Sequence, residues 1–243
     1  MELSLRYTPQ EARRLLFGLL IIEMLFVVAY IITHMTESIF TYRPLQRLFD
    51  LDGDLSIPAW FSSVQLLTVS VLLFLLSRQG LDKHPLPNSL FTIGGFIFFF
   101  LALDEGVAIH EQFTGLAIRL SFDWMLFKGN HGAWITGYMM VAVPAVWIAR
   151  PYIRKAWKYF RYEAQLALSG VVVFVTGAVG FEIISYLFLR SAQSSALYKT
   201  EVIFEEFFEM SGVSIILYAV LQLAYTISHE QHLSSFKQAS ADS

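Results

Sequence analysis

Long apolar runs alternate with short polar segments along the whole chain. A helix of roughly 20 apolar residues crosses a hydrocarbon core of ~30 Å, and inside a bilayer such a helix satisfies its own backbone hydrogen bonds. The pattern therefore predicts an all-α fold, a bundle of six transmembrane helices. The spans are expected at about residues 14–35, 57–77, 89–111, 132–149, 166–189 and 202–227.

Proline and glycine residues mark the connections between these spans. They are Pro44 and Gly53, Pro85 and Pro87, Gly129 and Gly132, and Pro151. Thr8-Pro9-Gln10-Glu11 is a capping-box sequence, which predicts a retained first helix and not a cleaved signal peptide. The chain has no internal repeat, so residues 1–243 are expected to form a single domain, with a disordered tail at 236–243.

The composition supports a membrane protein. Hydrophobic residues make up 56% of the chain and charged residues 15%, and the mean hydropathy is +0.55, far above that of a soluble domain. The net charge of −3 gives no basis for a nucleic-acid partner. The sequence contains no cysteine, which excludes disulfides and thiolate metal ligands.

Basic residues are divided unequally between the two ends of the predicted bundle. Eleven of the 17 Lys and Arg residues fall in the N-terminus, the second and fourth connections and the C-terminus, and six fall on the opposite side. Since cytoplasmic loops carry the excess of Lys and Arg, both termini are expected to be cytoplasmic. In this orientation most of the intramembrane acids lie in the outer half of the bundle.

Eight carboxylates interrupt the apolar runs, and no Lys or Arg lies in mid-span to neutralise them. An ionisable side chain at the bilayer centre costs about 2.5–3.5 kcal/mol on insertion scales, so such residues are usually partnered and usually functional. The partners available here are protons, histidines or a metal cation. The eight acids are Glu23, Asp104, Glu105, Glu111, Glu182, Glu205, Glu206 and Glu209.

All of these acids except Glu23 are expected at one depth near the outer side. Asp104 and Glu111 are seven residues apart and would share one face of a continuous third span. Glu205 and Glu209 are four residues apart in the sixth span, where like charges repel unless protons or a divalent cation offset them. Three histidines fall at the same level: His34, His110 and His131.

Structural explanations compete with this functional one. His110 and Glu111 could mark the wet end of a helix, and Glu182 could be a protonated, hydrogen-bonded structural residue. For Glu23, a structural role and a proton-relay role are both open. The acidic segment 50–54 is spaced like the start of a calcium loop but lacks the glycine and the bidentate glutamate of an EF-hand. A haem held by two of the histidines is a further alternative.

Several short motifs together resemble those of a group of bacterial membrane proteins with several spans. The resemblance touches most of the chain through spans two, three and six. It implies a multi-pass protein of the bacterial inner membrane whose motif residues act together, and it implies no particular activity. The motifs are Asp52 with Trp60-Phe61-Ser62-Ser63, Leu103-Asp104-Glu105 with His110-Glu111, and Glu205-Glu206 with Glu209.

The pattern favours a metal-dependent membrane enzyme, an oxidoreductase or a hydrolase, acting on a lipid or another apolar substrate. Carboxylates combined with imidazole suit iron, manganese or zinc, and suit magnesium or calcium less well. Glu105 and Glu205 are the catalytic candidates, as carboxylates left free to act as general base towards metal-bound water. The expected metal ligands are Asp104, His110, Glu111, His131, Glu182, Glu206 and Glu209.

Two other classes of protein fit the same residues. A proton- or cation-coupled transporter would load and release ions through these acids, with Glu23 as a relay group at a different depth, although no inverted repeat is visible. A non-catalytic subunit of a larger membrane complex would carry the acids as structural residues and bind other protein chains. Membrane lipid is the expected neighbour in every case.

Overall fold

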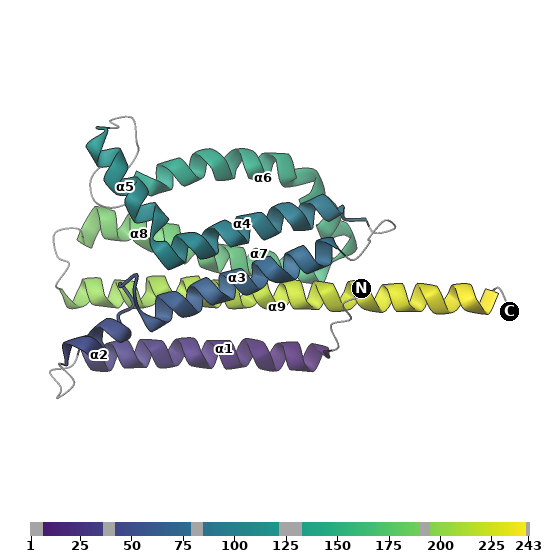
Figure 1. Ribbon diagram of the computed structural model, residues 1–243, viewed down its shortest axis with the longest axis horizontal. Helices are drawn as coiled ribbons and strands as arrows, with labels where there is room; N and C mark the ends of the chain where they lie inside the picture. The colour runs from purple at the N-terminus through teal and green to yellow at the C-terminus, as the bar shows by residue number, and fades with distance from the viewer. Residues whose placement is uncertain (1–6, 36–41, 79–84, 122–132, 190–194, 242–243) are drawn as a thin grey trace.

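Six membrane-spanning helices form the fold. The computed structural model describes residues 7–35, 42–78, 85–121, 133–189 and 195–241, with side chains up to residue 229 in the last range. Within these residues six helices are long and apolar enough to cross a membrane, and there is no β-strand. This confirms the all-α, six-span prediction. The helices run up and down one axis, so the first helix begins at the end of the bundle where the last one leaves (Figure 1).

The first two spans start where capping residues predict. In α1 (Pro9–Tyr30) the Thr8 hydroxyl accepts a hydrogen bond from the Glu11 N–H, and the Glu11 carboxylate accepts one from the Thr8 N–H. At α3 (Ile57–Ser77) the Ser56 hydroxyl accepts a hydrogen bond from the Ala59 N–H, without a reciprocal bond. These bonds satisfy N–H groups that have no partner inside the helix. Between the two spans lie the π-helical η1 (Ile31–Met35) and the short α2 (Arg43–Leu48).

The third span is not the continuous helix that the sequence predicts. α4 (Asn88–Val107) ends at Ala108, whose backbone is left-handed with φ 52° and ψ 50°, and α5 (Ile109–Arg119) starts in a new direction. A left-handed alanine costs roughly 1–2 kcal/mol, so surrounding contacts must hold it. Asp104 and Glu111 therefore do not share one helical face, and that expectation was wrong.

The fourth and fifth spans also differ from their predicted ends. α6 (Ala133–Tyr159) continues through Pro144 and Pro151, although Pro151 was expected to mark a connection. Prolines are tolerated in bilayer helices where neighbouring groups satisfy the freed carbonyls. Phe160 then separates α6 from α7 (Arg161–Val175). The fifth span continues through η2 (Thr176–Phe181), α8 (Glu182–Ile184) and η3 (Ser185–Leu189), of which η2 and η3 are π-helical.

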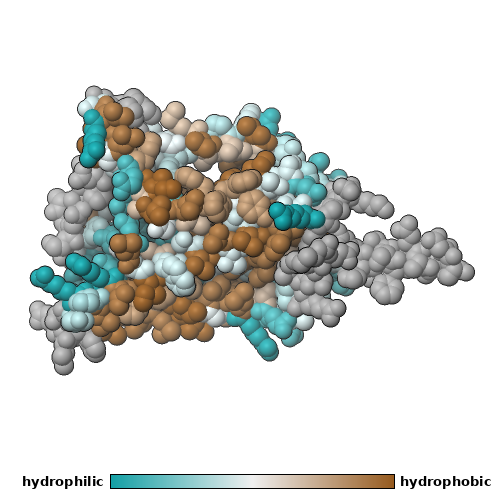
Figure 2. All heavy atoms as spheres, viewed as in Figure 1, coloured by the Kyte–Doolittle hydropathy of each residue, from teal (hydrophilic) through white to brown (hydrophobic). Residues whose placement is uncertain are grey.

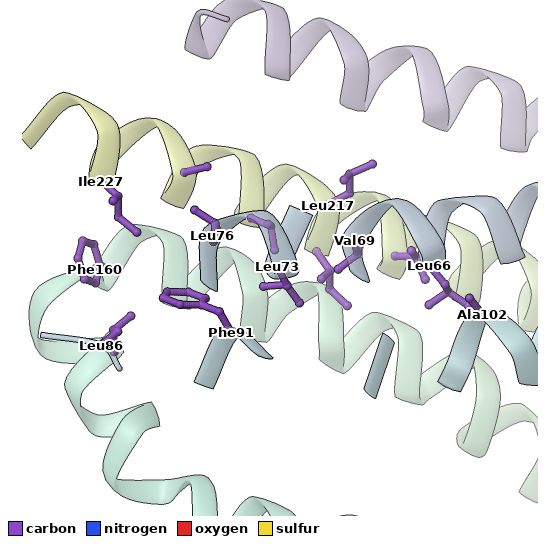
Figure 3. Packing of buried hydrophobic residues seen from close by; sticks show 14 residues of the cluster. Leu66, Val69, Leu73, Leu76, Leu86, Phe91, Ala102, Phe160, Leu217 and Ile227 are labelled. Atoms are coloured by element: carbon purple, nitrogen blue, oxygen red, sulfur yellow. The ribbon is translucent and has the colours of Figure 1, made fainter. Parts of the chain in front are cut away.

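The sixth span, α9 (Ala196–Ala241), is the central helix of the bundle. It packs against α1, α3 and α7, and buried apolar side chains such as Val69, Leu73 and Leu217 fill the space between these helices (Figure 3). A disordered tail was expected at 236–243, whereas the structure continues α9 to Ala241. Because α9 lies at the centre, residues along its length can face several other helices.

Glycine allows α7 and α9 to come unusually close. A Cβ atom on Gly212 would lie 2.5 Å from the backbone nitrogen of Phe174, and one on Gly170 would lie 2.8 Å from the carbonyl oxygen of Gly212. Small residues at such crossings permit backbone-to-backbone packing of membrane helices. The contact fixes α7 against α9 along the length of the fifth span.

By contrast, α6 stands apart from the bundle. It packs against α5 and α7 but not extensively against α4, and residues 139–148 are exposed on all sides. In Figure 1 it forms the outermost helix on one side, and Figure 2 shows a hydrophobic belt bounded by hydrophilic residues at the two ends of the bundle. The separation leaves a large internal space beside α6.

Candidate functional site

One cavity gathers most of the acids of the membrane-spanning helices. Its volume is ≈ 1480 Å³, above the ~300–1,000 Å³ typical of small-molecule pockets. Acidic side chains from the loop after α2 and from α4, α5, α8 and α9 face one end of this space, which we call the acid end. The acid end is lined by Asp52, Asp54, Asp104, Glu105, His110, Glu111, Glu182, Glu205, Glu206 and Glu209.

Eight of the nine residues selected from sequence line this cavity. The ninth, His131, lies outside the described residues. Glu23 and His34 are not among the lining residues. Asp52 and Asp54, which the sequence placed in an acidic loop and of which Asp52 also belongs to the resemblance motifs, face the cavity too, and so does Tyr198. The acidic segment 50–54 was the signal for the two aspartates, while Tyr198 carried none.

Asp104 organises the break between α4 and α5. Its Oδ1 atom accepts a hydrogen bond from the His110 N–H at 2.7 Å and lies 3.2 Å from His110 Nδ1. The carboxylate thus satisfies an N–H of the first turn of α5, which has no capping side chain at Ala108. The ring of His110 also lies 5.5 Å from that of Trp134 in α6. The left-handed turn at Ala108 therefore serves to direct His110 towards Asp104.

The electrostatics of α5 reflect this crowding. Burial opposes the charged form of His110, but the hydrogen bond and charge of Asp104, with the charges of Glu105 and Glu111, outweigh it and raise the pKa of His110. Burial and the neighbouring charge of Asp54 raise the pKa of Glu111. An acid and a base with pKa values raised by neighbours are typical of sites that exchange protons or bind cations.

Three glutamates of α9 face the acid end from the centre of the bundle. Glu205 and Glu209 are one turn apart, and Glu206 lies beside them. Gly177 of η2 lies directly against this turn, since a Cβ there would be 2.7 Å from Glu209 Cγ and 2.8 Å from the Glu205 carbonyl oxygen. The fifth span thus becomes π-helical beside Glu209 and again just after Glu182, and π-helical turns are frequent at functional sites.

Glu201, one turn before Glu205, is a buried acid among other acids. It is 6% exposed, and neither carboxylate oxygen has a hydrogen-bond partner within 3.5 Å among the described residues. Its charged neighbours are Glu182 and Asp52, and Glu205 and the hydroxyl of Ser185 are the polar groups nearest to its carboxylate. Buried carboxylates are normally paired or bound to metal ions, so this group indicates a requirement for a proton or a cation beside the acid end.

The loop before α3 closes the acid end. The Tyr198 hydroxyl donates to both oxygens of Asp52, at 3.2 and 3.0 Å, and Lys199 Nζ donates to the carbonyl oxygen of His34 at 2.7 Å. His34 Nε2 in turn lies 3.7 Å from Asp50. These contacts join the start of α9 to the end of the first span and hold Asp52 over the cavity.

The rest of the cavity is apolar. Phe174, Val175 and Val179 line it from α7 and η2, and one face of α6 lines it opposite them. That face ends at Arg150, whose guanidinium lies 3.9 Å from the ring centroid of Trp147. One space therefore combines an acidic end, an apolar middle and a basic far end.

The acid end is chemically suited to cations, although its side chains stand apart. Within the described part of the chain, no three His, Asp or Glu side chains are close enough to hold a metal ion as they lie. Like charges separate unless a counter-charge draws them together. The geometry therefore supplies oxygen and imidazole donors around an open space, and closing them on an ion requires rotations of side chains.

Comparison with known proteins identifies the family. Residues 19–223 match the family described as Domain of unknown function (DUF8692), and the chain belongs to that family. The match begins within the first span and ends within the sixth, covers the four spans between them, and includes the acid-bearing parts of α4 and α9. Neither a curated protein nor a solved structure matches the chain.

Proposed function

We propose that the protein is a metal-dependent membrane enzyme that acts on a lipid or another apolar substrate. The observation that carries the proposal is the cavity, which joins nine carboxylates and one imidazole at one end to an apolar space large enough for a lipid. A site that only stabilised the fold would have no need for that space. An apolar cavity with a few convergent polar groups is the usual form of a substrate site.

An ion would be held between α4, α5, α8 and α9. Glu182, Glu206 and Glu209 would supply oxygen ligands from two helices, and His110 would supply an imidazole. This mixture suits iron, manganese or zinc. His110 is held by Asp104, in the manner by which carboxylates orient metal-binding histidines. Such an ion would supply activation of water, and Glu105 and Glu205 would remain free to accept a proton as general base.

Elemental analysis of the purified protein tests the proposal. One or two transition-metal ions per chain are expected, and Glu206→Gln combined with Glu209→Gln should reduce the metal content at least about tenfold, since each removes a charged ligand. Glu163→Gln is the matched control. Glu163 is an acid in α7 that accepts a hydrogen bond from Thr226 at 2.7 Å and does not line the cavity. Metal-free wild type, or equal metal in the double variant and the control, would overturn the proposal.

Cation transport is the second candidate function, because the cavity follows α6 from the acid end to Arg150 and so spans much of the bundle. Glu23 does not support it, since it lies outside the cavity lining. Uptake of Mn²⁺ or Zn²⁺ into proteoliposomes, dependent on Glu206 and Glu209, would favour transport. Tight metal retention without flux would favour the enzyme.

For the setting, we propose the bacterial inner membrane with both termini in the cytoplasm. The excess of Lys and Arg at the end where α1 begins and α9 leaves supports this orientation. A reporter that fluoresces only in the cytoplasm, fused after Ser243, should be active. An alkaline phosphatase fusion at the same position should be inactive, and the reverse result would contradict the orientation.

A further inference from the structure

The cavity-facing side of α6 has no protein covering it. Residues Met139, Ala142, Val143, Val146, Trp147 and Arg150 recur every three or four positions and line the cavity from one face of the helix. Val146 on this face is 60% exposed, almost as much as Val141 on the opposite face at 71%. In a bilayer an apolar surface of this kind is covered by hydrocarbon, so something apolar occupies the cavity side as well.

The space has the dimensions of a membrane lipid. From Trp134 to Arg150 the cavity follows α6 for about 24 Å at 1.5 Å per residue, which is most of a ~30 Å hydrocarbon core. Its volume of ≈ 1480 Å³ is larger than pockets for ordinary small molecules. A long hydrocarbon chain fits this shape better than a compact solute does.

An entry route lies between α4 and α6. Phe100 of α4 contacts Tyr138 of α6 with ring centroids 5.9 Å apart, close to the acid end. Away from that contact the two helices do not pack extensively, and Ile97 of α4, one turn before Leu101 of the cavity lining, is 48% exposed. A lipid could therefore pass sideways from the bilayer without leaving the hydrocarbon region.

Charge decides which way the lipid lies. Arg150 ends the apolar face, stacks over Trp147, and is followed on the same helix by Arg154, Lys155 and Lys158. Arginine binds phosphate through two parallel N–H donors, and basic residues at a membrane surface attract anionic lipids. Nine carboxylates at the other end repel an anionic headgroup. The chain therefore points towards the acid end and the headgroup towards Arg150.

We propose that the cavity binds one membrane lipid with an anionic phosphate headgroup, held at Arg150, with its hydrocarbon chain lying along α6 towards the acid end. Binding itself does not depend on the proposed metal chemistry. One further conclusion does rest on the proposed function. If the protein is a metal-dependent enzyme, the part of the substrate that meets the metal is the hydrocarbon chain and not the headgroup.

Lipid binding by the purified full chain tests the proposal. The probes are phosphatidylglycerol, phosphatidylcholine with the same chains, and inorganic phosphate, titrated in a mild detergent and followed by native mass spectrometry. Wild type should retain one phosphatidylglycerol and prefer it about tenfold over phosphatidylcholine, as expected for a charge-assisted arginine–phosphate contact. Phosphate alone should not compete. Binding without a preference between the two lipids, or competition by phosphate alone, would overturn it.

Matched variants separate the two ends of the site. Arg150→Gln should abolish the preference for phosphatidylglycerol, while Arg154→Gln, four residues on and outside the cavity lining, should keep it. Ala142→Trp should fill the apolar face and reduce binding of both lipids at least about tenfold by steric exclusion, while Val141→Trp on the opposite face should not. Val146→Trp replaces Ala142→Trp if the latter fails to fold. Equal behaviour within either pair would overturn the proposal.

Metal analysis of the same samples distinguishes this inference from the proposed function. Arg150→Gln and Ala142→Trp change residues far along α6 from the acid end and should leave the metal content unchanged. Lipid selectivity in protein that never holds metal would support the lipid site and contradict the metal-dependent enzyme. Bound metal without lipid selectivity would support the metal site and contradict the lipid site.

Discussion

The hydrophobic spans contain glutamates in two kinds of surroundings, one rich in hydrogen-bond donors and the other rich in carboxylates. Glu23 of α1 is 0% exposed, and its Oε1 atom accepts hydrogen bonds from Ser214 at 2.6 Å and Gln65 at 3.0 Å. Gln65 also donates to Ser214 at 2.7 Å. We call these three residues, from α1, α3 and α9, the Glu23 node.

At the acid end the glutamates have other carboxylates as their neighbours. The electrostatic neighbours of Glu209 are Glu105, Glu182 and Asp104, all carboxylates, and the side chains face an open cavity. An acid inside a membrane helix is therefore not in itself a sign of function. Glu23 joins helices through Oε1, although its Oε2 atom has no hydrogen-bond partner among the described residues, whereas acids surrounded by acids and open space form the place where we propose a ligand.

The largest expected effect comes from removing the carboxylate of the node. Glu23→Ala should lower the free energy of unfolding by about 3 kcal/mol, because it opens a cavity and removes the acceptor of two buried donors. Glu23→Gln keeps a carbonyl oxygen in the same place and should cost less than about 1 kcal/mol. Unfolding of the detergent-solubilised protein, followed by circular dichroism, measures both.

The same pair of variants decides whether the node is structural or a relay. Metal content and lipid binding should be unchanged in Glu23→Gln, because Glu23 does not line the cavity. A stable Glu23→Gln protein that has lost its metal or its ion flux would show that the node communicates with the acid end, and the contrast between the two regions would fail.

The second prediction concerns the packing that positions the acid end. Gly177→Ala would place a Cβ atom 2.8 Å from the backbone nitrogen of Glu209, so α9 or η2 must shift. Overpacking of this kind typically costs about 1–3 kcal/mol, and we expect about 2 kcal/mol together with weaker metal binding. Gly180→Ala, on the same π-helical segment, meets only Thr176 Cγ2 at 3.6 Å and should be neutral.

A Gly177→Ala protein as stable as the Gly180→Ala control would mean that the approach of η2 to α9 is loose. In that case the position of Glu209 would not depend on backbone packing, and the acid end would resemble the Glu23 node in depending on side-chain contacts alone. Thermal unfolding and metal analysis on the two variants together give the answer.

The spans were predictable from sequence because apolar length and helix caps are local signals. Thr8 with Glu11 marks a real helix start. The acids that the helical pattern grouped also share one cavity, because residues at the same depth of neighbouring spans have few other places to face. The depth of a residue in the membrane follows from its position within an apolar span, which can be read from sequence.

The remaining features depend on tertiary contacts. The segment before Ala108 has no proline, and the left-handed turn there is held by the bond from the His110 N–H to Asp104. Pro151 looks like a helix end in sequence but lies within α6. Local propensity could not reveal that α6 stands away from α4, because the separation of two helices depends on tertiary contacts and leaves no signal in either segment alone. That separation creates the cavity.

The smallest expected effect has the opposite sign from the others. In the presence of a chelator, Glu209→Gln should raise the free energy of unfolding by about 1 kcal/mol, because it removes one of several carboxylates that repel each other where no hydrogen-bond donor compensates, and functional sites commonly carry such a cost. Adding Mn²⁺ or Zn²⁺ should stabilise wild type and leave the variant unchanged. Thermal unfolding with and without metal measures both terms. A Glu209→Gln protein destabilised as much as Glu23→Ala would show that Glu209 is a hydrogen-bonded structural residue, and the two regions would then differ only in depth.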